Sequence, residues 1–213
     1  GRDFQLNHAY ASPGTYQVLT AVENSEGRDF SEVEIHVISL SPTVGVVVGS
    51  TVAEGVDLSA TITITDPSAR IDLTGDDWTY FADWGDGSSE QFSPSVNNST
   101  TATAILTHSF DDPDDFDFEV RVTDADGDES TPTSDTIAVT NVIPTIDEIN
   151  ITASLGEGDF TVVSASASDP GKDRLTYLWN FDDGSPVQQG AVIKHAFPDD
   201  ADYDVTLTVI DEN

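Results

Sequence analysis

The sequence predicts an all-β protein made of tandem antiparallel β-sandwiches, and three observations lead to this fold class. First, several segments alternate apolar and polar residues with period two, among them VDLSATITI, FTVVSASAS, FEVRVTD and DVTLTVID. Such alternation is typical of half-buried strands. Second, turn sequences rich in Pro, Gly and Asp separate these segments, and no stretch shows a helical period. Third, one phrase recurs three times along the chain.

The recurring phrase begins at His8, His108 and His195. An aromatic residue follows two positions later, and a second aromatic follows six positions after the first. The histidines are 100 and 87 residues apart, close to the size of a small sandwich domain, roughly 100 residues. We therefore divide the chain into repeat 1 (residues 1–40), repeat 2 (residues 41–141) and repeat 3 (residues 142–213). Repeat 1 holds the C-terminal part of a unit, repeat 2 is complete, and repeat 3 lacks its last strand.

A second shared segment precedes the histidine in repeats 2 and 3. It reads YFADWGDGSSE in one and YLWNFDDGSPV in the other. Aromatic residues at such positions would serve both faces of a packed central strand. The glycine after the aspartate can adopt positive φ, and the aspartate can accept hydrogen bonds from turn amides. We interpret the segment as a core strand with its turn and not as an active site.

These residues resemble the PKD (polycystic kidney disease) family of immunoglobulin-like β-sandwiches. ADWGDGSS and LWNFDDGS are similar to the family's W-x-F-G-D-G element, with Asp182 in the place of Gly85. HAYASPGTYQVLTAVENSEG is similar to its H-x-Y…G-x-Y-x-V-x-L-x-V-x-D element, and HSFDDPDDFDFEVRVTDADG departs from it at Asp115 and Phe116. The resemblance extends over nearly the whole chain. It implies that the parent protein is of a kind that typically contains such domains, namely a surface-layer protein, an adhesin or a large exported enzyme.

Composition restricts the partners. The chain has 40 Asp and Glu against 7 Lys and Arg, a formal net charge of −33. Such a surface repels nucleic acid and anionic membranes, so we expect neither as a partner. Cysteine is absent, which excludes disulfides, thiolate metal sites and a cysteine nucleophile. No apolar run approaches the roughly 20 residues of a membrane helix, so no membrane insertion is expected.

The histidines are the main candidates for catalysis, because they could act as general bases beside carboxylates. A catalytic residue would not be needed in every tandem copy, however. We expect each repeated imidazole to bond a backbone group in the loop before its strand, and we predict no catalytic residue and no enzyme activity. His36 alternates with Ile35 and Val37 and is expected to face solvent.

Calcium is the one cofactor that the sequence favours, because oxygen ligands from several loops suit this ion. Some PKD domains bind calcium at matching aspartates, so the resemblance implies sites near the joints between repeats. The predicted metal residues are Asn141, Asp169, Asp173 and Asp211 in or beside repeat 3, and Ser39, Asp66, Asp76, Asp124 and Asp126 in or beside repeat 2. Carboxylates clustered within a few ångströms repel by about 1 kcal/mol per pair in water, and a cation would relieve this. Ordinary turn aspartates remain the alternative.

We therefore predict a non-catalytic extracellular or cell-surface spacer of the stalk, adhesin or surface-layer type. Its partners would be neighbouring repeats of the same chain. The incomplete ends favour a segment of a longer polypeptide over head-to-tail assembly with other copies. The alternative function is an accessory module that binds a polysaccharide or a protein substrate for a secreted enzyme, which would require an exposed aromatic such as Trp78. Sequons at Asn97, Asn98 and Asn150 could carry glycans or be ordinary polar residues.

Overall fold

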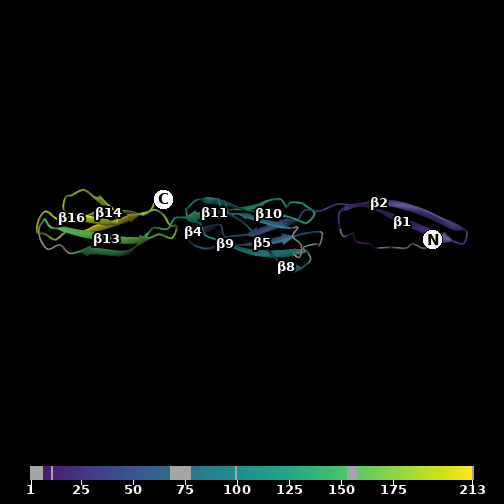
Figure 1. Ribbon diagram of the computed structural model, residues 1–213, viewed down its shortest axis with the longest axis horizontal. Coiled ribbons are helices and arrows are strands. Elements are labelled where there is room, and N and C mark those ends of the chain that lie inside the picture. Colours follow the sequence, from purple (N-terminus) through teal and green to yellow (C-terminus); the bar gives the residue numbers. More distant parts are fainter. Residues whose placement is uncertain (1–6, 11, 68–77, 99, 153–157, 213) are drawn as a thin grey trace.

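The computed structural model describes residues 7–10, 12–67, 78–98, 100–152 and 158–212. Within these ranges every regular element is a β-strand, which confirms the predicted all-β fold class. Nowhere in this part of the chain is there an apolar helix of the length needed to cross a membrane. The three repeats lie in a row along the long axis of the molecule (Figure 1).

Repeat 1 is a single long hairpin at one end of the row. Strands β1 (Gly14–Asn24) and β2 (Gly27–Val37) pair antiparallel along their full length. The Asn24 side chain accepts hydrogen bonds from the backbone N–H groups of Glu26 and Gly27 and so closes the turn. Val22 is 75% exposed, whereas its equivalent in repeat 2, Val122, is fully buried. The hairpin thus exposes to solvent the face whose equivalent in repeat 2 packs in the core.

Repeat 2 is a two-sheet sandwich. One sheet has the order β3-β5-β9-β8 and the other has the order β4-β11-β10-β6-β7. All pairs are antiparallel except β4 with β11, which is parallel and departs from the predicted purely antiparallel arrangement. The bounds are β3 (Thr43–Val47), β4 (Thr51–Ala53), β5 (Leu58–Thr65), β6 (Thr79–Asp83), β7 (Ser89–Gln91), β8 (Ser95–Asn98), β9 (Thr101–His108), β10 (Asp115–Thr123) and β11 (Thr133–Thr140).

The core of repeat 2 follows the predicted alternation. Ile62 and Ile64 on β5, and Phe118 and Val120 on β10, are fully buried. Trp84, at the end of the aromatic strand, lies between the sheets with its ring 4.3 Å from that of Phe118. Each such side chain contributes about 1.5–3 kcal/mol through burial. The aromatic segment is therefore a core strand, as predicted.

Repeat 3 has the same layout with fewer strands. Its sheets have the orders β12-β13-β16 and β15-β14-β17. The bounds are β12 (Thr145–Thr152), β13 (Phe160–Ser168), β14 (Thr176–Asn180), β15 (Gln188–Gln189), β16 (Val192–Ala196) and β17 (Thr206–Ile210). Strand β17 corresponds to β10, and no described strand of repeat 3 corresponds to β11. The core is smaller and centres on Val163, Trp179, Phe181 and Ile193.

Candidate metal centre

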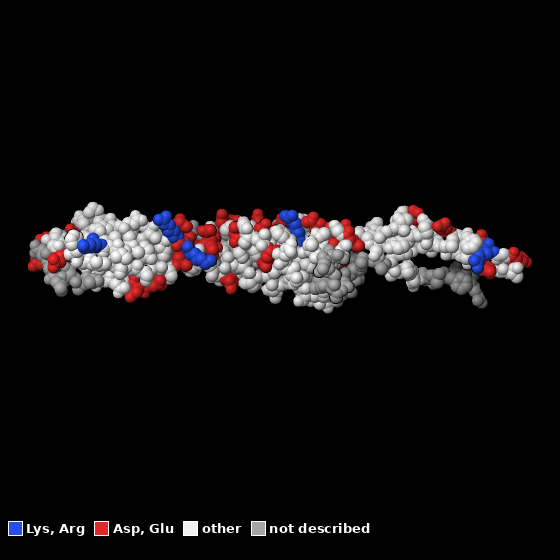
Figure 2. Space-filling view, in the orientation of Figure 1, with Lys and Arg blue, Asp and Glu red and all other residues white. Residues whose placement is uncertain are grey.

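Carboxylates from two repeats meet where repeat 2 joins repeat 3, a region that we call the 2–3 joint. Glu54 follows β4 at the end of repeat 2, and Asp169 and Asp173 lie in the loop between β13 and β14 of repeat 3. One oxygen from each of these three side chains lies within 4.8 Å of the others. In Figure 2 acidic side chains are dense on repeat 2 and at its border with repeat 3.

The environment of Glu54 is unusual for a carboxylate because the side chain is fully buried. Its Oε1 accepts a hydrogen bond of 2.7 Å from the backbone N–H of Val142, the first residue of repeat 3. Its Oε2 has no hydrogen-bond partner among the described residues, and neither does the buried Oδ2 of Asp169. Buried polar atoms are nearly always satisfied, so two unsatisfied carboxylate oxygens in one cluster require an explanation.

The electrostatic environment of Glu54 also favours a bound positive charge. Burial raises the pKa of Glu54, and repulsion by Asp173, Asp169 and Asp211 raises it further, while the Val142 N–H works in the opposite direction. A proton or a cation at this place would remove the penalty for the buried charge. The 2–3 joint is thus a place where the fold favours added positive charge.

The predicted ligands of repeat 3 are brought to this joint. Asp169 and Asp173 belong to the cluster itself. Asn141, after β11, donates a hydrogen bond of 3.3 Å from Nδ2 to Oδ2 of Asp211, after β17. Asp211 is near enough to raise the pKa of Glu54. All four side chains therefore lie at or beside one site.

Glu54 is not among the predicted ligands of this joint, which all came from repeat 3 and from the linker before it. A signal for it exists in the repeat pattern. Glu54-Gly55 stands twelve residues before the Asp66-Pro67 pair, and Glu157-Gly158 stands twelve residues before Asp169-Pro170. The repeat thus carries an acidic residue at both of its ends.

The predicted residues of repeat 2 are not assembled in the same way. Asp66 and Asp124 are buried, and Oδ1 of Asp124 accepts hydrogen bonds from the backbone N–H groups of Asp126 and Asp128 within its own turn. Among the described residues, three acidic or histidine side chains converge on one point only at the 2–3 joint. Ser39 lies in the connector between repeats 1 and 2, and Asp76 lies outside the described residues. A second calcium site here stays a prediction.

Backbone packing fixes the 2–3 joint as well. A Cβ on Gly55 would lie 2.3 Å from the carbonyl oxygen of Pro170, and a Cβ on Gly171 would lie 2.6 Å from that of Asp111. Each repeat thus places a glycine against the backbone of the other. Lys172, at φ 65°, extends back across the joint and donates from Nζ to Oδ1 of Asp111 at 2.7 Å.

The repeated histidines bind the Asp-Gly turn through its side chain. His108 Nε2 lies 2.7 Å from Oδ2 of Asp86, and His195 Nε2 lies 2.9 Å from Oδ2 of Asp183. The predicted backbone partner was wrong, because the aspartate of the aromatic segment points at the ring instead. Hydrogen bonds from the Ser185 hydroxyl and amide, together with His195, lower the pKa of Asp183 to about 2. These pairs clamp the turn to the following strand in both repeats.

The pair in repeat 2 does not have the geometry of a hydrolytic triad. Ser88 Oγ lies 3.4 Å from the same Nε2 of His108 that faces Asp86. A serine–histidine–aspartate relay needs the serine and the aspartate on opposite ring nitrogens. Burial opposes ionisation of Asp86, but hydrogen bonds from Ser88 and His108 outweigh it, so its pKa is lowered. The arrangement serves the turn. His36, as predicted, faces solvent.

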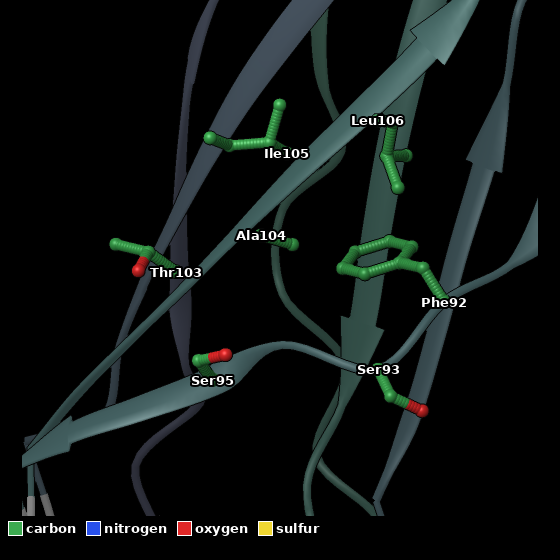
Figure 3. A pocket seen from close by; sticks show the side chains of 7 residues that line it. All are labelled: Phe92, Ser93, Ser95, Thr103, Ala104, Ile105 and Leu106. Atoms are coloured by element: carbon green, nitrogen blue, oxygen red, sulfur yellow. The ribbon is translucent and has the colours of Figure 1, made fainter.

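A shallow groove of about 440 Å³ opens beside β9 of repeat 2. Figure 3 shows Phe92 and Leu106 next to each other in it, with hydroxyl groups on Ser93, Ser95 and Thr103 around them. Ala104 and Ile105 complete the lining. None of these side chains titrates, so the groove offers no general acid or base.

The other candidate residues have ordinary roles in the structure. Trp78, expected as an exposed aromatic, is 9% exposed and stacks on Tyr80 in the core; that expectation was wrong. Asn98 accepts hydrogen bonds from the amide and hydroxyl of Thr100 and shapes the β8–β9 turn. Asn97 accepts one from the Thr103 hydroxyl, and Asn150 is exposed on β12.

The comparisons with known proteins give one family-model match and several similar solved structures. The family model for the PKD domain matches residues 141–213. Among solved structures, the PKD domain of an M14-like peptidase from Thermoplasmatales archaeon SCGC AB-540-F20 is 21% identical, with a TM-score of 0.38, over 48% of this chain and 98% of that one.

Two further solved structures are similar over most of this chain. The ICAM-5 D1–D4 ectodomain fragment is 13% identical, with a TM-score of 0.39, over 94% of this chain and 56% of that one. The chicken CNTN1 FN1–FN3 domains are 14% identical, with a TM-score of 0.26, over 92% of this chain and 70% of that one. Among curated proteins there is no match.

Proposed function

We propose that this chain, whose residues 141–213 match the family model for the PKD domain, is a non-catalytic spacer of an exported protein and that a calcium ion stiffens its 2–3 joint. The single observation that carries the proposal is the pair of buried carboxylate oxygens without partners, Oε2 of Glu54 and Oδ2 of Asp169. Their residues belong to different repeats and to one cluster of carboxylates. An ion between them would connect the two repeats directly.

The chemistry of the donors fits calcium. All candidate ligands are oxygens, which Ca²⁺ prefers, and it accepts six to eight of them at about 2.3–2.6 Å. Two oxygens bound to the same ion at such distances are at most about 5 Å apart. The 4.8 Å limit that encloses the Glu54, Asp169 and Asp173 oxygens satisfies this condition. Water would supply the remaining ligands.

A spacer role follows from the way the ligands are divided. Glu54 moves with repeat 2, while Asp169 and Asp173 move with repeat 3. Bending at the joint would separate the ligands, so the binding free energy of the ion would oppose bending. The interlocked glycines Gly55 and Gly171 already restrict the joint sterically. The row of repeats in Figure 1 would then behave as a stiff stalk.

The test is thermal unfolding of the chain with Ca²⁺ and with a chelator at fixed ionic strength. Calcium at 100 times its dissociation constant stabilises a protein by about 2.7 kcal/mol, so the midpoint for repeat 3 should rise by several degrees. Glu54→Gln should abolish this rise. Glu148→Gln, which replaces an exposed glutamate of repeat 3, is the matched control and should retain it. A wild-type midpoint that calcium leaves unchanged would refute the calcium proposal.

A further inference from the structure

The far end of repeat 3 carries a turn with the same geometry as the turn on which repeat 3 sits. Gly55 has φ 69° and donates from its N–H to the carbonyl oxygen of Phe110 at 2.8 Å. Gly158 has φ 76° and donates to the carbonyl oxygen of Phe197 at 3.1 Å. Phe110 and Phe197 each stand two residues after the repeated histidine. The two turns are therefore equivalent in sequence, backbone conformation and hydrogen bonding.

The two turns differ in what covers them. At Gly55 the Pro170 carbonyl of the next repeat lies where a Cβ would be, at 2.3 Å. At Gly158 no described residue comes within 4 Å of that position. The same surface is thus occupied at the end of repeat 2, whereas at the end of repeat 3 no described residue occupies it.

We propose that the Gly158 end of repeat 3 is a docking surface for a further sandwich repeat joined in tandem, entering with an Asp-Pro-Gly loop like residues 169–171. The glycine of that loop is required, because a Cβ on Gly171 would lie 2.6 Å from a backbone oxygen of repeat 2. This inference rests on the proposed role as a tandem spacer. It concerns a surface that the calcium proposal does not use.

A second copy of the chain does not fit this surface. The Asp-Pro-Gly loop of repeat 3 is already seated on Gly55 of its own chain. The corresponding pair in repeat 2, Asp66-Pro67, is followed in the sequence by Ser68 and not by glycine. The occupant must therefore be an additional repeat.

One feature of the 2–3 joint is not reproduced at the new surface. Pro198 stands in the place of Asp111, whose carboxylate receives the Lys172 ammonium group. The incoming repeat therefore has no need of a lysine after its glycine. The position before Gly158 is occupied by Glu157, as Glu54 precedes Gly55, but its side chain lies outside the described residues. The docking surface is assigned from the glycine turn alone.

An extended chain tests the proposal. Asp124 and Asp211 are equivalent positions, so repeating residues 127–213 directly after Asn213 continues the sequence in register. The added residues include a copy of β11, the natural partner of a β10-type strand such as β17. The chain has no cysteine, which allows spin labels at introduced cysteines. Thr63→Cys with Ser166→Cys reports on the 2–3 joint, and Ser166→Cys with the same change in the added copy reports on the new joint.

Docking at Gly158 predicts the same narrow distance distribution for both joints. Gly158→Val should broaden the distribution at the new joint and leave that of the 2–3 joint unchanged, and Gly55→Val should do the reverse. A narrow distribution at the 2–3 joint with a broad one at the new joint would overturn the inference. A broad distribution at the 2–3 joint in the presence of Ca²⁺ would instead contradict the proposed stiff spacer, so the two failures are distinguishable.

A transplant in the 213-residue chain gives a second test that does not depend on folding of the extended one. Val56→Asp with Asp57→Phe gives the turn of repeat 2 the two residues that follow Gly158 in repeat 3. The Thr63/Ser166 label distance should stay narrow if a turn of this sequence accepts the Asp-Pro-Gly loop. Broadening to the extent seen with Gly55→Val would contradict the proposal.

Discussion

The two joints of the chain have acidic residues at equivalent positions of the repeat, yet they differ in structure. At the 2–3 joint, Asp169 and Asp173 meet Glu54 from the preceding repeat. At the joint between repeats 1 and 2, Asp66, the equivalent of Asp169, and Asp124, the equivalent of Asp211, are also buried. There, however, repeat 1 contributes only the β1–β2 hairpin to the described structure, with no counterpart of Glu54.

The site at the 2–3 joint is composite, because its carboxylates come from two repeats. The aspartates of the entering repeat are held by their own turns, as in the bonds from the Asp126 and Asp128 amides to Asp124 and from the Gly171 amide to Asp169. What changes the chemistry is the buried glutamate supplied from the leaving end of the preceding repeat. Cation binding and joint formation are therefore expected to be coupled.

The largest effect should come from filling the space between the repeats. Gly55→Ala places a methyl group against the Pro170 backbone in a turn with positive φ. Gly158→Ala is the control, because Gly158 also has a positive φ but no described residue lies where its methyl group would be. Both variants bear the cost of a left-handed conformation, about 1–2 kcal/mol. Gly55→Ala should cost about 1–3 kcal/mol more because of overpacking. Urea unfolding measures the difference, and equal losses would show that the contact at the joint contributes nothing.

The next effect is the pH dependence of the joint without calcium. The folded-state pKa of Glu54 is raised, so the folded state prefers the protonated form. Its contribution to stability is then lost as pH rises from the unfolded value, about 4.3, through the folded value. In chelator, wild-type stability should fall relative to Glu54→Gln between pH 4 and pH 7.5, and calcium should cancel the difference at pH 7.5. Parallel pH profiles would contradict a buried, charged Glu54.

Equivalent aspartates at the two joints should respond differently to substitution. Asp169→Asn removes a carboxylate oxygen of the cluster and should weaken calcium binding at least tenfold, a change of about 1.4 kcal/mol. Asp66→Asn should leave the affinity of the 2–3 joint unchanged. Isothermal titration calorimetry resolves both. If Asp66→Asn removes a separate binding event, a second ion binds between repeats 1 and 2; if it weakens the same event, the composite site is wrong.

The smallest effect on calcium affinity should come from replacing a carboxylate whose hydrogen bonds lie within one repeat. The pKa of Asp183 is lowered to about 2, first by the Ser185 hydroxyl. Its contribution to stability is present above the unfolded value, about 3.9, and is lost as pH falls towards 2. Asp183→Asn should lower the unfolding midpoint of repeat 3 at pH 7 and flatten its decline between pH 4 and pH 2. The calcium affinity of the 2–3 joint should stay unchanged. A large loss of affinity would mean that the stability of repeat 3 and calcium binding at the joint are coupled.

The strands and cores were predictable because burial imposes a period of two on each strand. The alternation around Ile62 and Ile64 predicted the buried face of β5, and the spacing of Tyr80 and Trp84 predicted their shared face. Trp78 was misjudged because it precedes β6, where alternation is weak evidence, and its stacking on Tyr80 depends on tertiary packing.

The candidate site was half predictable. Asp169 and Asp173 could be found because turn aspartates near a linker follow the local repeat pattern. Glu54 belongs to another repeat, and its distance from Asp169 depends on how two domains are joined. The partner of the histidines, Asp86 or Asp183, was missed for the same reason, since it is set by the packing of two non-adjacent strands.

The most direct test of the central claim is anomalous scattering from crystals of the chain grown with calcium. The composite site predicts one peak within about 2.3–2.6 Å of Oε2 of Glu54, Oδ2 of Asp169 and a carboxylate oxygen of Asp173. No peak at these oxygens, with Glu54 turned to water or protonated against Asp169, would contradict the claim that a cation holds the two repeats together.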